Sequence, residues 1–271
     1  MTRIFRQIAG LRPGRKWAGR AGARRIGALL LAAAAGAAAQ GPAGTVPPAP
    51  RTQVARFVVV LDAAHGGDDS GAQLADSVAE KNVTLALSVR LRSLLTARGF
   101  SVTTTREGNV NVDSDGRAQI ANHAVASASG ASACLSLHAS EAGAGVHIFV
   151  SSLGAAPATR FLAWKTAQAA YVNRSLKLAG TMNSAFEHSS LNGAADGNAG
   201  PIPATLARAS LPGVDSMTCP AVAIEMAPIR DANHRVATEV TDPGYQQQVV
   251  EALAAALLEW KTDGETEGRL P

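Results

Sequence analysis

A continuous run of β-branched and other apolar residues, Phe57 to Leu61, is the feature that most restricts the fold of this chain. No polar residue stands at alternate positions in the run, so a strand formed here must be buried on both faces. Strands of this kind belong to sheets covered by helices on both sides, and the segments that follow alternate between helical and strand patterns. We therefore predict an α/β fold, a single domain with an open, mostly parallel, twisted sheet of about six strands and helices on both faces.

The other elements are predicted from the spacing of apolar residues. From Glu80 to Arg98 apolar residues recur at helical spacing, and Gly99 follows at the position where helices commonly end. The pattern over 157–188 fits one helix or two, and 188–203, rich in Ser, Asn, Gly, Asp and Pro, is predicted to be a long loop and a candidate lid. Further strands are expected at 101–106, 133–137, 145–151, 204–208 and 221–226, and further helices at 114–128 and 243–260.

The first residues have the layout of an export signal. Residues 1–39 contain a basic stretch, an apolar run at 26–35 and small residues with an Ala-x-Ala pattern at 37–39. The apolar core is about 14 residues long, shorter than the roughly 20 that span a bilayer as a helix, so no stable membrane span is expected in the mature protein. Arg24-Arg25 leaves open whether export uses the general or the twin-arginine route.

The rest of the chain is long enough for one ordinary domain. Residues 40–55, rich in Gly and Pro, are expected to form a flexible linker, and 56–271 a single catalytic domain with a full hydrophobic core. The signal in residues 1–39 predicts that this domain is exported.

The formal net charge of +4 suggests nucleic-acid binding until the distribution of charge is considered. The first 50 residues hold eight Lys or Arg and no acidic residue, which leaves 17 basic against 21 acidic residues in the remainder. Nucleic-acid binding depends on basic side chains that neutralise phosphates, and the domain is mildly acidic. We therefore expect no nucleic-acid partner.

The chain has two cysteines, Cys134 and Cys219, which excludes a disulfide-rich scaffold and a four-cysteine zinc site. Each precedes a candidate site residue on an apolar strand, so pairing in an oxidising compartment is one alternative. The preferred expectation from the sequence is two buried free thiols.

Polar residues that follow apolar strands are candidate site residues, because ligands bind outside the carboxyl ends of strands in open α/β sheets. His65 follows the first strand in Leu61-Asp-Ala-Ala-His-Gly-Gly67, His138 ends the strand at 133–137, and Glu225 lies near the end of 221–226. Two imidazoles at one sheet edge suggest a metal ion, and Glu80, at the start of the next helix, can point back over that edge as a third ligand.

Each of these residues also has an ordinary structural interpretation. Ser77-Val-Ala-Glu80 fits a capping box, in which Glu80 would bond the backbone of Ser77. His138 fits a buried histidine with satisfied hydrogen bonds, and Glu225 fits a buried acid paired with an arginine such as Arg208. Residue type and spacing leave these alternatives open.

Taken together, the motifs from residue 58 to 138 resemble family 3 of the N-acetylmuramoyl-L-alanine amidases in order and spacing. The quoted elements are Leu61-Asp-Ala-Ala-His-Gly-Gly67, Glu80-Lys-Asn-Val83, Arg98-Gly-Phe100, Thr105-Arg106, Arg117-Ala-Gln-Ile-Ala-Asn122 and Ser136-Leu-His138. Downstream, Pro220-Ala-Val-Ala-Ile-Glu225 is similar to the segment with the family's catalytic glutamate, and 242–260 to its last helix.

The resemblance implies a zinc-dependent hydrolase with one zinc ion held by His65, Glu80 and His138 and with Glu225 as the catalytic residue. It implies cleavage of the amide bond between N-acetylmuramic acid and L-alanine of peptidoglycan stem peptides, in cell-wall remodelling or daughter-cell separation. Peptidoglycan is then the substrate, and an activator protein is a further partner. The resemblance also implies that the exported protein is periplasmic or associated with the cell wall. Some members carry an inhibitory segment between the third ligand and the catalytic glutamate, where this chain has the loop at 188–203.

Two departures from the family pattern stand beside the presumed site residues. Ala63-Ala64 replaces the usual Pro-Gly before His65, and Met226-Ala-Pro-Ile229 replaces the usual Gly-Phe and a downstream Ser-Asn after Glu225. Two other functions therefore remain as alternatives, a non-catalytic peptidoglycan-binding protein on an amidase fold and a zinc peptidase that acts within the stem peptide. The other histidines, at 123, 147, 188 and 234, match no ligand position and are expected to be structural or at the surface, although His188 adjoins the long loop.

Overall fold

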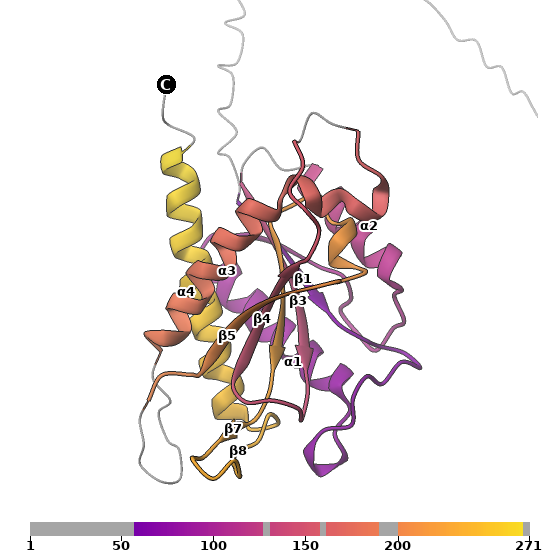
Figure 1. Cartoon of the computed structure of the whole chain (residues 1–271). Coiled ribbons are helices and arrows are strands. Elements are labelled where there is room, and N and C mark those ends of the chain that lie inside the picture. Colours follow the sequence, from indigo (N-terminus) through magenta and orange to yellow (C-terminus); the bar gives the residue numbers. More distant parts are fainter. Residues whose placement is uncertain (1–56, 127–130, 158–160, 190–199, 268–271) are drawn as a thin grey trace, which may run out of the picture. The chain divides into compact units, whose positions relative to one another are not determined.

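A six-stranded mixed sheet forms the centre of the domain (Figure 1). The computed structural model describes residues 57–126, 131–157, 161–189 and 200–267. The predicted export signal at 1–39 and linker at 40–55 lie outside the described residues. The strands are β1 (Val58–Ala63), β2 (Ser101–Thr104), β3 (Ser132–Ala139), β4 (Val146–Ser151), β5 (Ala204–Ala209) and β6 (Ala221–Met226), in the order β2-β1-β3-β6-β4-β5.

Four of the five strand pairings are parallel, and only β4 and β6 run antiparallel to each other. The carboxyl ends of β1, β3 and β6 therefore lie at one edge of the sheet. The register places Ala63 of β1 beside Leu137 of β3, and His138 of β3 beside Glu225 of β6. The mostly parallel sheet predicted from the sequence is confirmed, and its register brings the segments with candidate residues together.

Three α-helices cover one face of this sheet: α1 (Glu80–Ala97), α3 (Val172–Glu187) and α4 (Pro243–Glu267). Their apolar side chains form a large core with alternate residues of the strands, such as Leu61, Leu137 and Ile224. Gly99 has a φ of 81°, the left-handed conformation that ends α1 as the sequence predicts.

The opposite face is covered by α2 (Ser114–Ala126) and the 3-10 segments η2 (Trp164–Ala170) and η3 (Val214–Ser216). Its apolar cluster is smaller and contains mainly Ala, Val and Cys residues, including Val60, Ala118 and Ala221. Helices therefore lie on both faces, as predicted, but the two layers differ in size and chemistry.

Three local elements were left open or were not predicted from the sequence. The pattern over 157–188 is two elements, η2 and α3, and Gly180 lies inside α3 without interrupting it. A short hairpin of β7 (Ile229–Arg230) and β8 (Val236–Thr238), which the sequence did not predict, follows β6. A 3-10 turn, η1 (Ala75–Ser77), precedes α1.

The expectation of two free thiols is wrong, because Cys134 and Cys219 form a disulfide. Both residues are fully buried, and the bond joins β3 to the segment that enters β6. The neighbouring backbones already meet there, since the N–H of Cys134 donates to the carbonyl of Pro220. The bond spans 85 residues of sequence, so the pairing that was the alternative expectation is formed, and the two cysteines are brought together by the pairing of β3 with β6. Among the helices of the described part, none is long and apolar enough to cross a membrane.

Candidate metal centre and active site

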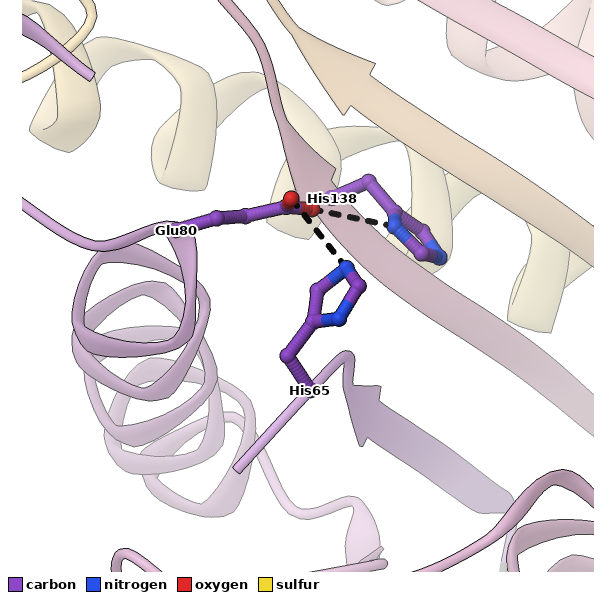
Figure 2. Close-up of side chains that lie close together, drawn as sticks. All are labelled: His65, Glu80 and His138. Atoms are coloured by element: carbon purple, nitrogen blue, oxygen red, sulfur yellow. Dashed lines mark hydrogen bonds and ion pairs between the residues drawn. The ribbon is translucent and has the colours of Figure 1, made fainter. Parts of the chain in front are cut away.

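His65, Glu80 and His138 converge at the carboxyl edge of the sheet (Figure 2). His65 lies in the loop after β1, Glu80 is the first residue of α1, and His138 lies near the end of β3. One ligand atom from each lies within 4.8 Å of the others. Glu80 Oε2 is 3.1 Å from Nε2 of His65, and Glu80 Oε1 is 3.1 Å from Nδ1 of His138. The structure therefore brings together the three residues that were predicted as ligands from the sequence.

Glu80 points into this cluster and takes no part in a capping box. The residue before it, Ala79, occupies the N-cap position of α1 with no side-chain cap, so the Ser77 interpretation is wrong. The backbone N–H groups of Ala72 and Ala139 instead donate to its two carboxylate oxygens, at 2.9 and 3.1 Å. Burial by itself would raise the pKa of Glu80, but the hydrogen bonds from His138 and these two amides outweigh it and lower the pKa. Glu80 is therefore held as a carboxylate although it is only 5% exposed.

The His65 side chain is oriented by a carboxylate on its outer side. Nδ1 of His65 lies 2.8 Å from Oδ2 of Asp69, and this hydrogen bond is the main cause of the lowered pKa of Asp69. In the tautomer that donates its Nδ1 proton to Asp69, Nε2 of His65 is free to bind a metal ion on the side of Glu80. Such a carboxylate on the far nitrogen is the usual companion of a metal-bound histidine.

Close packing around the His65 loop requires unusual backbone conformations. His65 itself has a φ of 61°, which few residues other than glycine adopt. At Gly71, with a φ of 63°, an added Cβ would lie 2.6 Å from both Glu80 Oε2 and His65 Cδ2. Only glycine leaves room for the imidazole and the carboxylate to approach each other here.

Two arginines hold the backbone of this loop through its carbonyl groups. Arg106 donates to the carbonyls of Ala63 and Ala64 at 2.8 and 3.0 Å, and Arg117 donates to those of Ala63 and His65 at 2.6 and 2.8 Å. Because these contacts use main-chain oxygens, they do not depend on the Pro-Gly that Ala63-Ala64 replaces. Both arginines lie within the motifs that resemble the amidase family, and their place in those motifs was the only sign in the sequence of this role.

The donor set of the cluster suits a metal ion. Two imidazole nitrogens and a carboxylate oxygen face one another, and lone pairs in that arrangement repel unless a proton or cation lies between them. Two histidines and one acid are also a known ligand set of catalytic zinc sites, in which a fourth position is left for water. The cluster could therefore hold zinc with protein ligands on one side and the cavity on the other.

A cavity of about 540 Å³ opens beside the cluster on the face of the sheet that α2 covers. His65 and His138 form part of its lining, and another part is formed by Leu211 to Val214, which run into the first residue of η3. The first turn of α2 contributes Ser114, and the buried strand residue Ala223 contributes from β6. The volume lies within the usual range for pockets that bind small molecules.

Glu225 lies next to His138 across the β3–β6 pairing, two residues after Ala223 on the same face of β6. Residues in register on adjacent strands project to the same face, so the Glu225 side chain belongs to the face that carries the cavity. Its carboxylate forms no hydrogen bond or ion pair with another described residue. Arg208 instead donates to the carbonyls of Ser151 and Leu153, so the proposed Glu225–Arg208 pair is not formed.

The segment that replaces Gly-Phe after Glu225 is fixed by backbone contacts. The N–H of Ala227 donates to the carbonyl of Gly145, and the N–H of Gly145 donates to that of Pro228, at 2.8 and 2.9 Å. The Tyr245 hydroxyl donates to the carbonyl of Ala227, and burial of this phenol raises its pKa well above the ordinary value. The altered residues thus form an ordered continuation of β6.

The four other histidines do not belong to the cluster. His188 closes α3, where its Nδ1 lies 2.7 Å from the Ser184 carbonyl, in a groove between α3 and α4. That groove lies on the helix-covered face opposite the cavity. His147 contacts Thr205 on β5, while His123 lies in α2 and His234 in the β7–β8 turn.

The fold and this cluster define a class of protein, a mostly parallel α/β domain with a candidate metal centre at the carboxyl edge of its sheet. The model of amidase family 3, described as N-acetylmuramoyl-L-alanine amidase, matches residues 59–259. The chain therefore belongs to the N-acetylmuramoyl-L-alanine amidase family.

Individual relatives agree with this assignment. The N-acetylmuramoyl-L-alanine amidase AmiA of Escherichia coli is 35% identical over 92 residues, which are 34% of this chain and 30% of that protein. The chain thus matches less than a third of this relative's length. The amidase Ami1 of Mycobacterium smegmatis matches in structure with a TM-score of 0.55 and 22% identity, over 77% of this chain and 98% of its own. The CwlD amidase of Clostridioides difficile, solved in complex with the GerS lipoprotein, has a TM-score of 0.52 and 18% identity, over 76% and 98%.

Proposed function

We propose that this chain is an exported zinc amidase that hydrolyses the bond between N-acetylmuramic acid and the L-alanine of peptidoglycan stem peptides. The observation that carries the proposal is the convergence of His65, Glu80 and His138 beside a cavity, in a chain that belongs to this amidase family. Glu225 lies on the adjacent strand β6, and its carboxylate has no hydrogen-bond or ion-pair partner among the described residues. It supplies the remaining catalytic group.

Each residue has a distinct role in this proposal. His65, Glu80 and His138 would hold one zinc ion, which when bound supplies a Lewis acid for the scissile carbonyl and lowers the pKa of water. Glu225 takes a proton from the attacking water and passes it to the nitrogen of the departing L-alanine. An amide needs this second step because its amine leaves poorly unless it is protonated. The cavity wall holds the substrate carbonyl near the cluster and limits the access of bulk water.

The decisive experiment uses purified peptidoglycan sacculi and compares the wild type with Glu225→Gln. We expect the wild type to release intact stem peptides and Glu225→Gln to be slower by at least a hundredfold, since general acid–base catalysis contributes about that much or more. Glu259→Gln, which removes an exposed carboxylate of α4, is the matched control and should keep wild-type activity. Equal rates for wild type and Glu225→Gln would refute the role of Glu225.

The same assay separates the two alternative functions. A binding protein without turnover would sediment with sacculi and release nothing from them in the presence of zinc. A zinc peptidase would release fragments of the stem peptide, whereas the amidase releases the whole stem with L-alanine at its free amino end. The mass of the released product therefore identifies the bond that is cut.

The metal requirement is tested on the same protein. Treatment with a chelator should abolish release, and one equivalent of zinc should restore it. Glu80→Gln should bind zinc far more weakly, since it replaces an anionic ligand by a neutral amide. Full activity after exhaustive chelation would exclude the proposed zinc chemistry.

We extend the proposal to location and partners. Export is supported by the basic and apolar pattern of 1–39, and cell fractionation with amino-terminal sequencing of the mature protein would test it. An activator protein is supported by CwlD, which was solved with a lipoprotein partner. We also propose that the loop 188–203 regulates access, although 190–199 lie outside the described residues. Unchanged hydrolysis after deletion of 190–199 would argue against that role.

A further inference from the structure

A buried carboxylate, Asp62, lies behind the metal cluster near the end of β1 and is only 4% exposed. Three side chains donate to it: Thr105 Oγ1 at 2.7 Å and Arg117 at 2.6 Å to one oxygen, and Ser136 Oγ at 2.7 Å to the other. A buried charge is costly unless it is paired and hydrogen-bonded, and here both oxygens are engaged. Such a complete set of partners fixes the position of the carboxylate.

The Ser136 hydroxyl connects Asp62 to His138. These two residues of β3 are two positions apart on the same face, and Ser136 Oγ lies 3.4 Å from Nε2 of His138. Because the serine donates its only hydroxyl proton to Asp62, its oxygen acts as an acceptor towards the imidazole. In the metal-free protein a proton lies between Nδ1 of His138 and Oε1 of Glu80, which are 3.1 Å apart. When a metal ion takes the place of that proton, the ring proton that remains is the one on Nε2, which faces the Ser136 oxygen.

The Arg117 guanidinium connects Asp62 to the other histidine. One nitrogen of Arg117 donates both to Asp62 and to the carbonyl of Ala63, and a second donates to the carbonyl of His65. The ion pair between Asp62 and Arg117 is almost entirely buried. A single carboxylate is thus in hydrogen-bonded contact with the supports of both histidines.

We propose that Asp62 is a positioning residue: through Ser136 it keeps the ring proton of His138 on Nε2, so that Nδ1 is the metal-ligating atom. Through Arg117 it holds the backbone that carries His65. The inference rests on the proposed function, because it takes the cluster to bind zinc. Partners of this kind set the tautomer and orientation of metal-bound histidines and strengthen binding.

Ser136→Ala is the first test, because it removes the connection to His138 and leaves the ion pair of Asp62 with Arg117 intact. Thr105→Val is its matched control, because it also removes a hydroxyl that donates a hydrogen bond to Asp62. That hydroxyl binds the other carboxylate oxygen, on the side away from His138. Zinc affinity is measured on purified protein by competition with a chromophoric chelator. We expect Ser136→Ala to bind zinc about tenfold more weakly and Thr105→Val to bind as the wild type does.

Thermal unfolding of the metal-free variants supplies the structural baseline. Both substitutions should lower Tm by similar amounts, so a difference in zinc affinity cannot come from stability alone. Equal zinc affinity in Ser136→Ala and the wild type would overturn the inference. So would an equal loss of affinity in both variants.

The tautomer is tested directly by NMR of the zinc-loaded protein with ¹⁵N-labelled histidine. We expect a protonated Nε2 and a metal-bound Nδ1 for the signal that disappears in His138→Gln. A metal-bound Nε2 would overturn the inference while leaving zinc binding, and so the proposed function, intact. A wild type that binds no zinc would overturn both, which distinguishes the two failures.

Discussion

The two faces of the sheet show how this domain separates stability from chemistry. One face packs α1, α3 and α4 on large apolar residues such as Leu91 and Leu137. The other packs α2 and short 3-10 segments on smaller residues and also carries Asp62, His138 and Glu225. A face that holds charged groups cannot gain as much from apolar burial. It is restrained instead by a disulfide, the buried Asp62–Arg117 ion pair and backbone hydrogen bonds.

We call the face with Asp62, His138 and Glu225 the polar face, and the face covered by α1, α3 and α4 the apolar face. If this comparison holds, the Cys134–Cys219 disulfide is the largest single stabiliser of the polar face. The double variant Cys134→Ala/Cys219→Ala should lose about 4 kcal/mol of unfolding free energy, since the bond closes a long loop in the unfolded chain. Denaturant unfolding measures the loss, and the wild type in strong reductant should behave like the variant. Zinc affinity of the folded variant should not change, because the β3–β6 hydrogen bonds still set the register. A loss below 1 kcal/mol would show that this face does not depend on its cross-link.

On the apolar face, loss of side-chain volume should lower the free energy of unfolding without changing zinc affinity. Leu91→Ala, at a fully buried position of α1, should cost about 3 kcal/mol, the sum of lost burial and the cavity left behind. Leu258→Ala on α4, where the side chain is 43% exposed, is the control and should cost much less. Both variants should bind zinc as the wild type does once folded. Weaker zinc binding in Leu91→Ala would mean that the two faces are coupled.

The contrast also explains what the sequence could predict. The strand at 57–61 and the helix from Glu80 were predictable because their apolar periodicity is a local property of the chain. The disulfide and the direction of the Glu80 side chain were not, because each depends on which strands become neighbours. The local sequence around Glu80 fits a capping box. Only the fold brings the backbone N–H groups of Ala72 and Ala139 to its carboxylate, which they hold in the cluster with the two histidines.

The candidate ligands were recognised from the family resemblance, whereas their supports were not. Asp62 and Ser136 lie within the motifs that resemble the family, but nothing in residue type or spacing shows that they hydrogen-bond each other across β1 and β3. The same holds for Arg117, which reaches its partners from α2. Contacts between side chains of separate elements require the register and packing of the folded chain.

Two glycines with left-handed backbones, Gly71 beside the candidate metal cluster and Gly99 at the end of α1, separate crowding at the cluster from ordinary backbone strain. An added Cβ at Gly71 would collide with Glu80 and His65, while at Gly99 it would meet nothing within 4 Å. Gly99→Ala should cost about 1 kcal/mol of stability from backbone strain and leave zinc affinity unchanged. Gly71→Ala carries a similar strain but should also weaken zinc binding by at least tenfold, since two ligands must move. Zinc titration and thermal unfolding of both variants measure this, and equal zinc affinities would refute the crowding argument.

The smallest expected effect is the response of the metal-free protein to acid. The pKa of Glu80 in the folded state lies below its ordinary value of 4.5, so the unfolded chain binds a proton more readily. The stabilisation from this carboxylate is therefore complete above about pH 4.5 and is lost as the pH falls through the lowered folded value. Asp69 shifts in the same direction, but its side chain is 56% exposed and solvent screens its contribution.

Thermal unfolding between pH 6 and pH 3, after removal of metal, should show the Tm of Glu80→Gln falling less steeply than that of the wild type. Glutamine does not ionise, so the variant lacks the part of the pH dependence of stability that comes from protonation of Glu80. Glu259→Gln removes an exposed carboxylate from α4 on the apolar side and should keep the wild-type slope. If Glu80→Gln and Glu259→Gln change the slope equally, the acid response does not arise from the hydrogen bonds that His138, Ala72 and Ala139 make to Glu80.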